Sequence, residues 1–314
     1  MRTSIKSIKL SNSTTKNTLI TIVGATAIGK TALSIKLAKY FNSDIISCDS
    51  RQFFKEMTIG TAVPDFDELA AATHHFIQNK SIFEEYSVGQ FEKDTLNKLD
   101  DLFAKNPIQI MVGGSGLYVD AVLKGLDYFP EVDPSIRINL TKELEENGIE
   151  PLQNKLKALD IETYNSIAID NPHRVMRALE ICIGTGKTYT SFKNKPKAPR
   201  NFKSIKIGLT ADREIMYDRI NRRVSIMMDN GLLDEAKNLY PNKNLNALKT
   251  VGYRELFEYL DGNFTKGFAI EEIKKNTRRF AKRQGTWFRK DKEIVWFDYQ
   301  SGLETIVTAI KNQF

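Results

Sequence analysis

One short stretch constrains the fold more than any other part of the chain. It is Gly24-Ala25-Thr26-Ala27-Ile28-Gly29-Lys30-Thr31, which fits the pattern G-x-x-x-x-G-K-[ST]. The apolar run Leu19–Val23 precedes it, and a helical pattern over Thr31–Tyr40 follows it. A strand, a glycine loop and a helix in this order form a cradle for phosphate, because backbone N–H groups and the helix N-terminus point at the anion. The alternative is a strand–turn–helix that contains glycines without binding anything.

In such a loop Lys30 reaches the terminal phosphates, and the Thr31 hydroxyl can bind Mg²⁺. By motif alone the ligand would be ATP or GTP. A nucleotide hydrolase also has a strand that ends in an acid for Mg²⁺. The run Ile108–Val112 ends instead in Gly113-Gly114-Ser115-Gly116. The pattern therefore predicts a phosphate site and leaves open which molecule carries the phosphate.

Further short apolar runs predict a parallel sheet. They lie at Asp44–Ser47, Ile108–Val112, Ile205–Leu209 and Ile294–Phe297. Runs of this kind are typical of strands that are buried on both faces by helices. Because strands alternate with helical patterns, we predict an α/β fold, a doubly wound parallel sheet around the phosphate loop.

The middle of the chain has a different pattern. Pro134, Pro151 and Pro172 divide it into helical pieces such as Ile136–Glu146 and Pro172–Ile183, and no strand is evident. The segment 193–200 is polar and rich in proline, which is typical of a linker. We predict an all-helical insertion over residues 126–200, between core segments 18–125 and 201–314.

Positive charge gathers near the C-terminus. The net charge is +7, and Glu271–Lys292 holds nine Lys or Arg against three Asp or Glu. On a helix, Lys274, Arg278 and Lys282 form one row and Lys275, Arg279 and Arg283 the next. We place Ile273, Phe280 and Trp287, which repeat every seven residues, on the buried side. This segment predicts a surface for a polyanion, with a solvated basic helix as the alternative.

The cysteine content and the hydropathy limit the cellular compartments that we expect for the protein. Only Cys48 and Cys182 are present, which suggests a reducing cytoplasm rather than a disulfide framework. No apolar run approaches the roughly 18 residues that span a bilayer, so we expect no membrane segment. The first 17 residues carry four basic residues and no acid. We expect an N-terminal tail there, with a transit peptide as the alternative.

Asp49 closely follows the predicted core strand Asp44–Ser47. The carboxyl ends of parallel strands share one rim, so Asp49 is expected to face Lys30 and Thr31. Three roles are open for it at this point: a partner of Mg²⁺, a turn-forming residue, or a general base.

The chain resembles the tRNA dimethylallyltransferases, also called tRNA isopentenyltransferases, from about Leu19 to Phe297. The resemblance rests on the two segments around Lys30 and Asp49 together with the following further motifs: Thr58-Ile59-Gly60-Thr61-Ala62, His74-His75-Phe76, Tyr86-Ser87-Val88 with Phe91, Gly113-Gly114-Ser115-Gly116-Leu117-Tyr118, Arg174–Glu180, Gly252-Tyr253-Arg254-Glu255-Leu256 and Ala281–Arg289.

The resemblance implies transfer of a dimethylallyl group from dimethylallyl diphosphate to the exocyclic N6 amine of the adenosine 3′ of the anticodon. The glycine loop would then hold the diphosphate leaving group, with Mg²⁺ at Thr31. Lys30 would neutralise the departing charge, Arg223 would contact the diphosphate, and Asp49 would act as the base. For Arg223 a solvated helix face is the alternative. A monomer is expected.

The resemblance also assigns residues to the anticodon stem-loop of the tRNA. They are Asp49, Ser50, Arg51, Gln52, Ser115, Arg137, His173, Arg174, Arg177, Gly252, Tyr253, Arg254, Lys282, Arg283, Gln284 and Arg289. Ser115 stands where relatives commonly have Thr, and Ala25 where they often have Pro. We assign Trp287 to the core, and His74 and His75 to structural hydrogen bonds.

Three other functions fit parts of the pattern. An enzyme of the same chemistry could use a free adenine nucleotide as acceptor, although so large a basic surface is not needed for one. A nucleoside or nucleotide kinase would share the phosphate loop. A non-catalytic RNA-binding module would need only the basic segment.

Overall fold

The computed structural model describes residues 17–314, so all but the last residue of the basic N-terminal stretch lies outside the described residues. The chain forms two compact units. Gly125–Pro199 is the smaller unit, and the segments before and after it together make the larger one. Each unit is described by itself.

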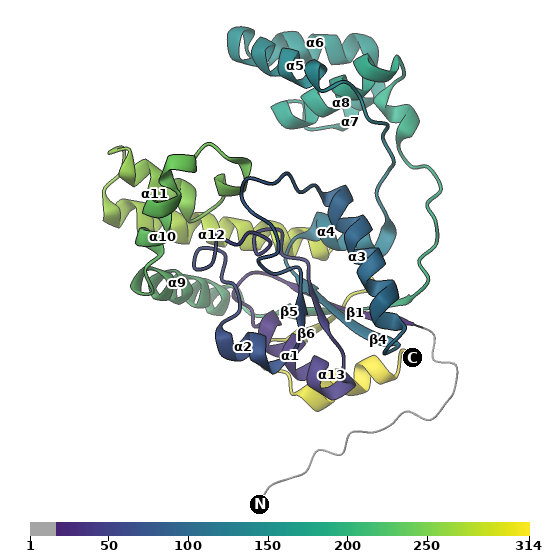
Figure 1. The fold of residues 1–314 in the computed structure, drawn as a ribbon, viewed down its shortest axis with the longest axis vertical. Helices are drawn as coiled ribbons and strands as arrows, with labels where there is room; N and C mark the ends of the chain where they lie inside the picture. The colour runs from purple at the N-terminus through teal and green to yellow at the C-terminus, as the bar shows by residue number, and fades with distance from the viewer. Residues whose placement is uncertain (1–16) are drawn as a thin grey trace, which may run out of the picture. The chain divides into compact units, whose positions relative to one another are not determined.

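The larger unit is built on a six-stranded sheet in the order β3-β2-β4-β1-β5-β6 (Figure 1). Every neighbouring pair is parallel, so the predicted α/β doubly wound fold is confirmed. The strands are β1 Thr18–Gly24, β2 Ile45–Ser47, β3 His74–His75, β4 Ile108–Gly113, β5 Lys203–Thr210 and β6 Val295–Asp298. Only β3 was not predicted, because two histidines at the sheet edge form no apolar run.

Helices cover both faces of this sheet. On one face, α1 (Lys30–Phe41) and α13 (Leu303–Lys311) pack against Ile20 and Ile22 of β1. On the other face, α3 (Val88–Phe103), α4 (Gly116–Lys124) and the end of α12 (Lys266–Phe288) pack against Leu19 and Val23. Alternate residues of β1 therefore serve two different cores, as the pleat of a strand requires.

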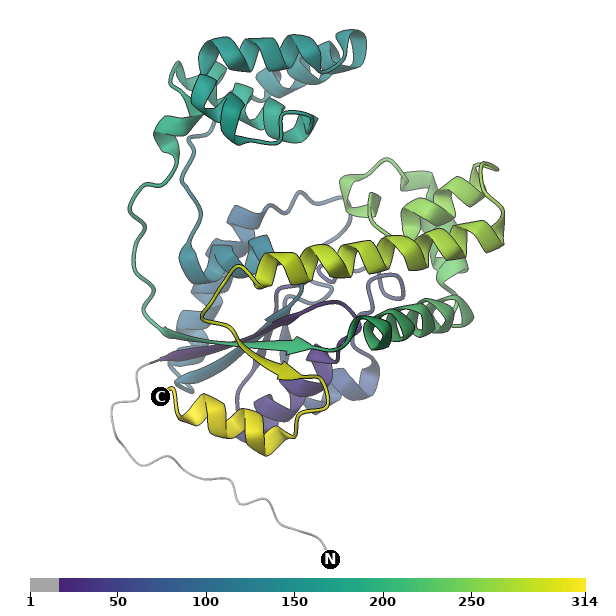
Figure 2. The same ribbon diagram turned by 180° about the vertical axis from the view of Figure 1, so that it is seen from behind.

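A group of helices with its own apolar core lies beside the sheet. It comprises α9 (Arg213–Asp229), α10 (Leu232–Leu239), α11 (Tyr253–Leu260) and the first half of α12, with short 3₁₀ helices at Tyr240–Asn242 and Asn246–Leu248. Figure 2 shows α12 as the long yellow-green helix that runs from this group across the sheet. A single helix thus connects the helical group to the end of β1.

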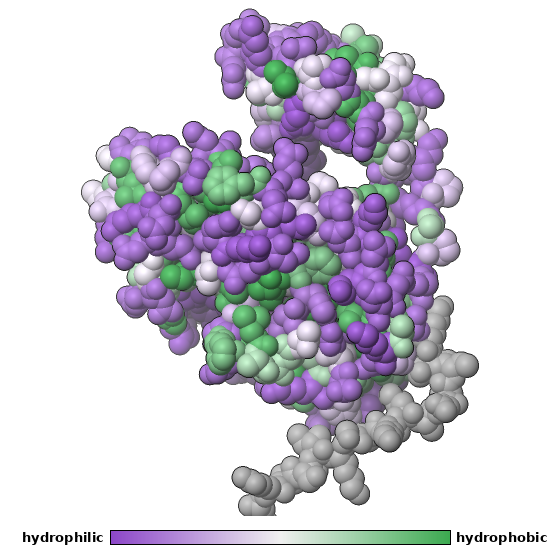
Figure 3. Space-filling view, in the orientation of Figure 1, coloured by the Kyte–Doolittle hydropathy of each residue, from purple (hydrophilic) through white to green (hydrophobic). Residues whose placement is uncertain are grey.

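Short α2 (Phe66–Ala71) is held by its cap rather than by an apolar face. Asp65 accepts a hydrogen bond from the Glu68 amide, and the Glu68 carboxylate accepts one from the Asp65 amide. Phe66 is 84% exposed, and Figure 3 shows hydrophobic surface at this helix on an otherwise mostly hydrophilic face. Within residues 17–314, no helix is long and apolar enough to cross a membrane.

The smaller unit is helical. Its helices are α5 Pro134–Asn147, α6 Glu150–Leu159, α7 Ile161–Ser166 and α8 Pro172–Thr185, followed by a 3₁₀ helix at Tyr189–Phe192. Leu152, Leu156 and Val175 belong to its fully buried core. The buried carboxylate of Asp160 accepts hydrogen bonds from the amides and hydroxyls of Thr163 and Thr190, which ties α7 to the 3₁₀ helix.

Gly113 at the end of β4 allows close approach of the chain that follows β2. A Cβ at this position would lie 2.5 Å from the Cys48 sulfur and 2.6 Å from its carbonyl carbon. We expect Gly113→Ala to lower the free energy of unfolding by about 1–3 kcal/mol, as overpacking does. Gly267→Ala in the first turn of α12 is the control, since its Cβ would meet nothing within 4 Å. Removing this glycine should raise stability by about 0.5–1 kcal/mol. Thermal unfolding of both variants measures the difference, and equal stability of Gly113→Ala and the wild type would contradict the packing argument.

Candidate active site

The glycine loop adopts the conformation that a phosphate cradle needs. Gly24 has φ +147°, and a Cβ there would lie 2.8 Å from the Leu209 carbonyl oxygen, so no larger residue fits. Ala27 has φ +64°, an uncommon value for a residue with a Cβ. Its carbonyl accepts a hydrogen bond of 2.8 Å from Nε of Arg219 on α9. Gly29 precedes α1 without capping it through a side chain, which leaves the first amides of the helix available to an anion.

Cations gather at this loop without an acid bound to them. Lys30 Nζ donates a hydrogen bond of 2.8 Å to the Ala25 carbonyl. Burial lowers the pKa of Lys30 to about 8, and the Asp49 carboxylate offsets part of that shift. Burial, and after it the neighbouring Arg219, lowers the pKa of Arg223. Neither Lys30 nor Arg223 forms an ion pair with any residue of the described chain. Both side chains are half-buried, and a partly desolvated cation without an ion-paired acid is costly, so this arrangement favours a bound anion.

Asp49 faces the same cavity from the end of β2. The cavity, of ≈ 60 Å³, is lined by Thr26, Lys30, Thr31, Ser47, Asp49, Gln52, Thr61, Ala62, Pro64, His74, Ile77, Val112, Gly113 and Arg223. Oδ1 of Asp49 accepts a hydrogen bond of 3.1 Å from the Arg51 amide, which is an Asx turn. Asp49 therefore does form a turn. Its carboxylate still faces the cavity beside the glycine loop, so the turn is compatible with a chemical role.

The neighbours of Asp49 are fixed to one another by hydrogen bonds. Ser115 Oγ accepts from the Ser50 amide at 3.1 Å, and Arg51 donates to the Ala247 carbonyl at 3.2 Å. Gln52 is among the residues that the resemblance assigns to the tRNA. In the structure its Nε2 donates to the Ala62 carbonyl and its Oε1 accepts from Ser47 Oγ. Both ends of the Gln52 amide are used inside the protein, so its part is to hold the wall of the cavity.

Gln284 connects three separate elements, and sequence patterns did not predict this. It was expected to touch tRNA, but it is 6% exposed. Its Oε1 accepts a hydrogen bond of 2.9 Å from the Thr26 amide of the glycine loop. Its Nε2 donates one of 2.9 Å to the Gly114 carbonyl after β4. The tRNA-contact prediction for Gln284 is corrected accordingly: its amide is consumed in joining α12 to the loop.

Two other expected contacts are also buried. Gly252 and Tyr253 lie under the surface, with Tyr253 0% exposed, so Arg254 alone of this trio is exposed. Tyr253 O–H donates a hydrogen bond of 2.6 Å to Glu235 on α10. The glycine and the tyrosine belong to the packing of α11, and Tyr253 presents no side-chain surface to solvent.

On α12 the expected buried face is only partly correct. Ile273 is buried, but Phe280 is 38% and Trp287 is 40% exposed. Strict seven-residue spacing drifts around a straight helix by about 20° per repeat, so the third member leaves the core face. Besides Ile273, the buried residues of α12 are Ala269, Ala281, Gln284 and Phe288. Trp287 donates its indole N–H to Asp120 at 2.9 Å, and its ring lies against Gly116.

The cations of α12 fall into two groups. Lys274 and Lys275, near its start, are paired with Glu271 and Glu272. Further along, Lys282, Arg283 and Arg289 are exposed and form no ion pair among residues 17–314. The surplus charge that the sequence indicated therefore lies in the second half of the helix, next to the glycine loop.

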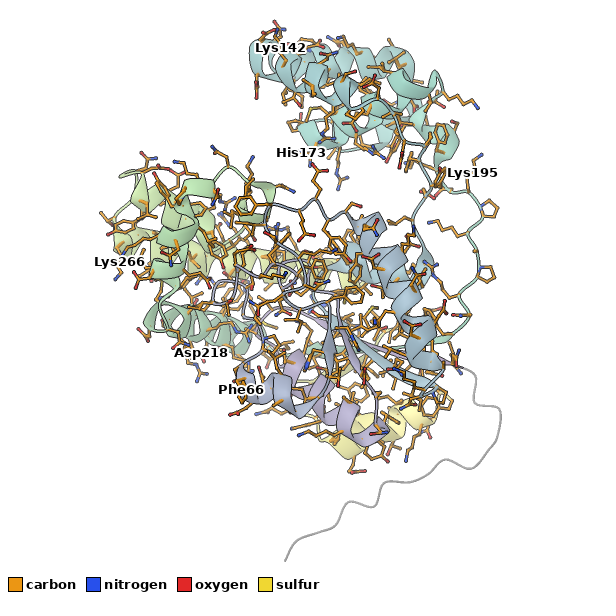
Figure 4. All side chains as sticks on the ribbon, viewed as in Figure 1. Phe66, Lys142, His173, Lys195, Asp218 and Lys266 are labelled. Carbon is orange, nitrogen blue, oxygen red and sulfur yellow. The ribbon has the colours of Figure 1, made fainter. Side chains whose placement is uncertain are left out.

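The smaller unit carries its own exposed cations. His173, Arg174 and Arg177 lie on the exposed side of α8, and Figure 4 shows His173 projecting from the start of that helix. Arg137 and Arg177 both bind the buried carboxylate of Glu180, at 2.6 and 3.2 Å. Both guanidinium groups remain about half exposed, so they can still meet a polyanion.

The two adjacent histidines have mainly structural hydrogen bonds, as expected. His75 Nε2 lies 2.7 Å from Asp44 Oδ2, and His74 Nδ1 lies 2.8 Å from the Ala72 carbonyl. Burial lowers the pKa of His74. His74 also lines the cavity, which the sequence did not predict.

Comparison with known proteins places the chain in a family. The profile of that family, IPP transferase, matches residues 52–291. The chain belongs to the IPP transferase family. It is 64% identical to a tRNA dimethylallyltransferase of Flavobacterium psychrophilum over 95% of this chain and 99% of that one. A second tRNA dimethylallyltransferase, from Christiangramia forsetii, is 62% identical over 95% and 98% of the two chains.

Solved structures of this family have the same fold. The tRNA isopentenylpyrophosphate transferase of Bacillus halodurans aligns with a TM-score of 0.69 at 38% identity, covering 95% of each chain. A eukaryotic dimethylallyltransferase, solved while acting on tRNA, aligns with a TM-score of 0.80 at 26% identity. That alignment covers 95% of this chain and 79% of the other.

The position of Gln284 predicts a defect in anion binding when it is removed. Gln284→Ala leaves the Thr26 N–H and the Gly114 carbonyl without partners, and each buried unsatisfied group costs about 1–3 kcal/mol. We expect affinity for inorganic diphosphate, measured by calorimetry, to fall about tenfold as the loop loses its support, a change of about 1.4 kcal/mol. Thr286→Ala is the control, because that exposed hydroxyl bonds only to the Lys282 carbonyl. Wild-type diphosphate affinity in Gln284→Ala would refute the role assigned to Gln284.

Proposed function

We propose that the chain transfers a dimethylallyl group from dimethylallyl diphosphate to the N6 amine of the adenosine 3′ of the anticodon in certain tRNAs, and releases diphosphate. The single observation that carries this proposal is the cavity that holds Lys30 and Arg223 on one side and Asp49 on the other. Membership of the IPP transferase family and the names of the relatives support it. One chain carries both halves of this cavity, so the proposal is for a monomer that acts in the cytoplasm.

The cradle suits a leaving group. An allylic C–O bond breaks with its electron pair on oxygen, so negative charge builds up on the departing diphosphate. Lys30, Arg223 and the amides at the start of α1 surround the position of that charge, and fixed charges in a dry site stabilise it far better than water does. No phosphoryl group moves in this reaction.

The oxygen groups of the cavity fit Mg²⁺. No cluster of three His, Cys, Asp or Glu side chains that could hold a metal occurs within residues 17–314. Mg²⁺ needs no such cluster, since it is usually held by one or two protein oxygens, waters and substrate phosphates. The Thr31 hydroxyl, with Asp49 nearby, would hold it beside the diphosphate, where it would add positive charge against the leaving group.

Asp49 is placed to accept the proton that the adenine amine loses. A bond forms between N6 and the allylic carbon, the C–O bond breaks, and the proton passes from N6 to the carboxylate. The lone pair of this amine is delocalised into the ring, so a base contributes about 10²–10⁴-fold to the rate. The Asx turn holds the carboxylate toward the cavity.

The acceptor side requires RNA. An adenosine must leave its stack to reach the cavity, and bases in single-stranded loops can do so. Lys282, Arg283 and Arg289 are exposed beside the loop, and Arg174 and Arg177 are exposed on the smaller unit. A free adenine nucleotide would need none of these cations, and a kinase would need an acid after β4, where Gly113 and Gly114 stand.

Asp49→Asn tests the base. The asparagine oxygen can still accept the Arg51 amide, so the turn persists while the base is lost. We expect transfer of labelled dimethylallyl groups to an anticodon stem-loop to slow by about 10²–10⁴-fold. Affinity for the stem-loop should change less than twofold. Asp49→Ala, which also removes the turn, should be no more active. Substantial transfer by Asp49→Asn would exclude the base role.

The two groups of cations on α12 predict different salt dependence. Lys282→Ala with Arg283→Ala should lower the slope of log affinity against log salt by about 1.4–1.8, since each lost phosphate contact accounts for about 0.7–0.9. Lys274→Ala with Lys275→Ala removes the same charge from residues already paired with Glu271 and Glu272. It should alter the slope far less. Equal changes in the two double variants would show that RNA does not select the second half of the helix.

A further inference from the structure

A carboxylate outside the cavity holds the loop that forms one of the cavity's walls. Glu235 on α10 accepts hydrogen bonds from three consecutive backbone amides, Thr58 at 3.0 Å, Ile59 at 2.8 Å and Gly60 at 2.9 Å. The Tyr253 hydroxyl donates a fourth, at 2.6 Å. A carboxylate accepts at both oxygens and donates at neither, so it suits four converging donors as no neutral side chain does.

The same loop reaches Asp49 through a continuous series of hydrogen bonds. Directly after Gly60, Thr61 and Ala62 line the cavity. The Ala62 carbonyl accepts from Gln52 Nε2 at 2.8 Å, and Gln52 Oε1 accepts from Ser47 Oγ at 3.1 Å. Ser47 Oγ in turn accepts from the Asp49 amide at 3.4 Å. Ala62 has φ +52°, a conformation that a residue with a Cβ keeps only when its surroundings enforce it.

Packing makes this anchor rigid. A Cβ on Gly60 would lie 2.5 Å from the Tyr253 ring, so the loop backbone rests directly on that ring. Tyr253 is fully buried, and burial together with Glu235 raises its pKa, so its hydroxyl remains a donor. The loop backbone at Gly60 is therefore held in a fixed position against Glu235 of α10 and Tyr253 of α11.

We propose that Glu235 is a positioning residue for the transfer reaction, which acts by fixing loop 58–62 and, through Gln52 and Ser47, the place of Asp49. The inference rests on the proposed function. It assigns a catalytic consequence to a residue that touches neither substrate. It also explains why Tyr253 lies inside the protein: its hydroxyl completes the carboxylate anchor instead of meeting RNA.

Glu235→Gln tests the inference with almost no change in volume. The side-chain nitrogen of glutamine cannot accept a hydrogen bond, so at least one backbone amide of the loop loses its acceptor. We expect the Gly60 amide to be the one most affected. We expect kcat per titrated active site to fall about tenfold, a barrier change of about 1.4 kcal/mol. The KM for stem-loop RNA and the affinity for inorganic diphosphate should stay within twofold. Hydrogen exchange at the Thr58–Gly60 amides should become at least tenfold faster.

Asp234→Asn is the matched control, because it makes the same chemical change one residue earlier, at an exposed acid paired only with Lys237. It should leave both kcat and loop exchange unchanged. Tyr253→Phe removes one of the four hydrogen bonds and keeps the buried ring. It should lower kcat about threefold, and it decides the matter if Glu235→Gln does not fold.

Several results would overturn the inference. One is wild-type kcat in Glu235→Gln with faster loop exchange, which would separate the loop from the chemistry. Another is unchanged exchange, which would deny that the carboxylate holds the loop. The inference would also be overturned by equal losses of kcat in Glu235→Gln and Asp234→Asn, or by a wild-type kcat in Tyr253→Phe. If the wild-type chain transfers no dimethylallyl group, the proposed function is refuted instead. Hydrogen exchange at the loop amides would still test whether Glu235 holds the loop.

Discussion

The site depends on holding positive charge beside the glycine loop without an ion pair to an acid of the described chain. Lys30 at the start of α1 and Arg223 on α9 form no ion pair with an acid of the described chain, and burial is the main cause that lowers the pKa of both. The fold tolerates this because β1 is flanked by strands on both sides and α9 brings its arginines to the loop from a separate helical group. An anion that arrives there relieves a cost already present in the free protein. This is a sound design for a leaving group, since the stabilisation grows as the anion separates.

Helix α12 turns that local site into a site for a large substrate. Its first half packs in the helical group, and its second half supplies Gln284 to the glycine loop, directly after the exposed cations Lys282 and Arg283. RNA that bound to Lys282 and Arg283, as proposed, would lie next to the side chain that supports Thr26. The helix also contacts the loop after β4 through the same amide. A single helix thus carries both the exposed cations proposed to meet RNA and the amide that supports the glycine loop.

Much of the fold could be predicted from the sequence, and the reasons for the failures are physical. Buried parallel strands are apolar on both faces, so their runs are visible, whereas the two-residue strand β3 has no such run. The glycine loop is a contiguous motif, so it could be recognised from the sequence. Gln284, Gln52 and Tyr253 were assigned to RNA because they lie in motifs that resemble a tRNA-binding family. Each spends its polar groups on a partner inside the fold, and the Gln284 partner lies 258 residues away. Sequence patterns show which polar residues a chain has, but not which of them form their hydrogen bonds inside the folded protein.

The same distinction bears on the three roles that the sequence left open for Asp49. The sequence left a turn, a metal partner and a base as separate possibilities. The Asx turn uses one carboxylate oxygen on the Arg51 amide, two residues ahead, and this bond sets the direction of the side chain. Gln52 and Ser47 then fix the backbone from behind, and loop 58–62 fixes Gln52. A base that must meet a weakly nucleophilic amine gains most from such fixed placement, because a misplacement of 1 Å can cost about a hundredfold in rate. The Asx turn therefore supports the proposed role of Asp49 as a base, because it limits the directions that its carboxylate can take.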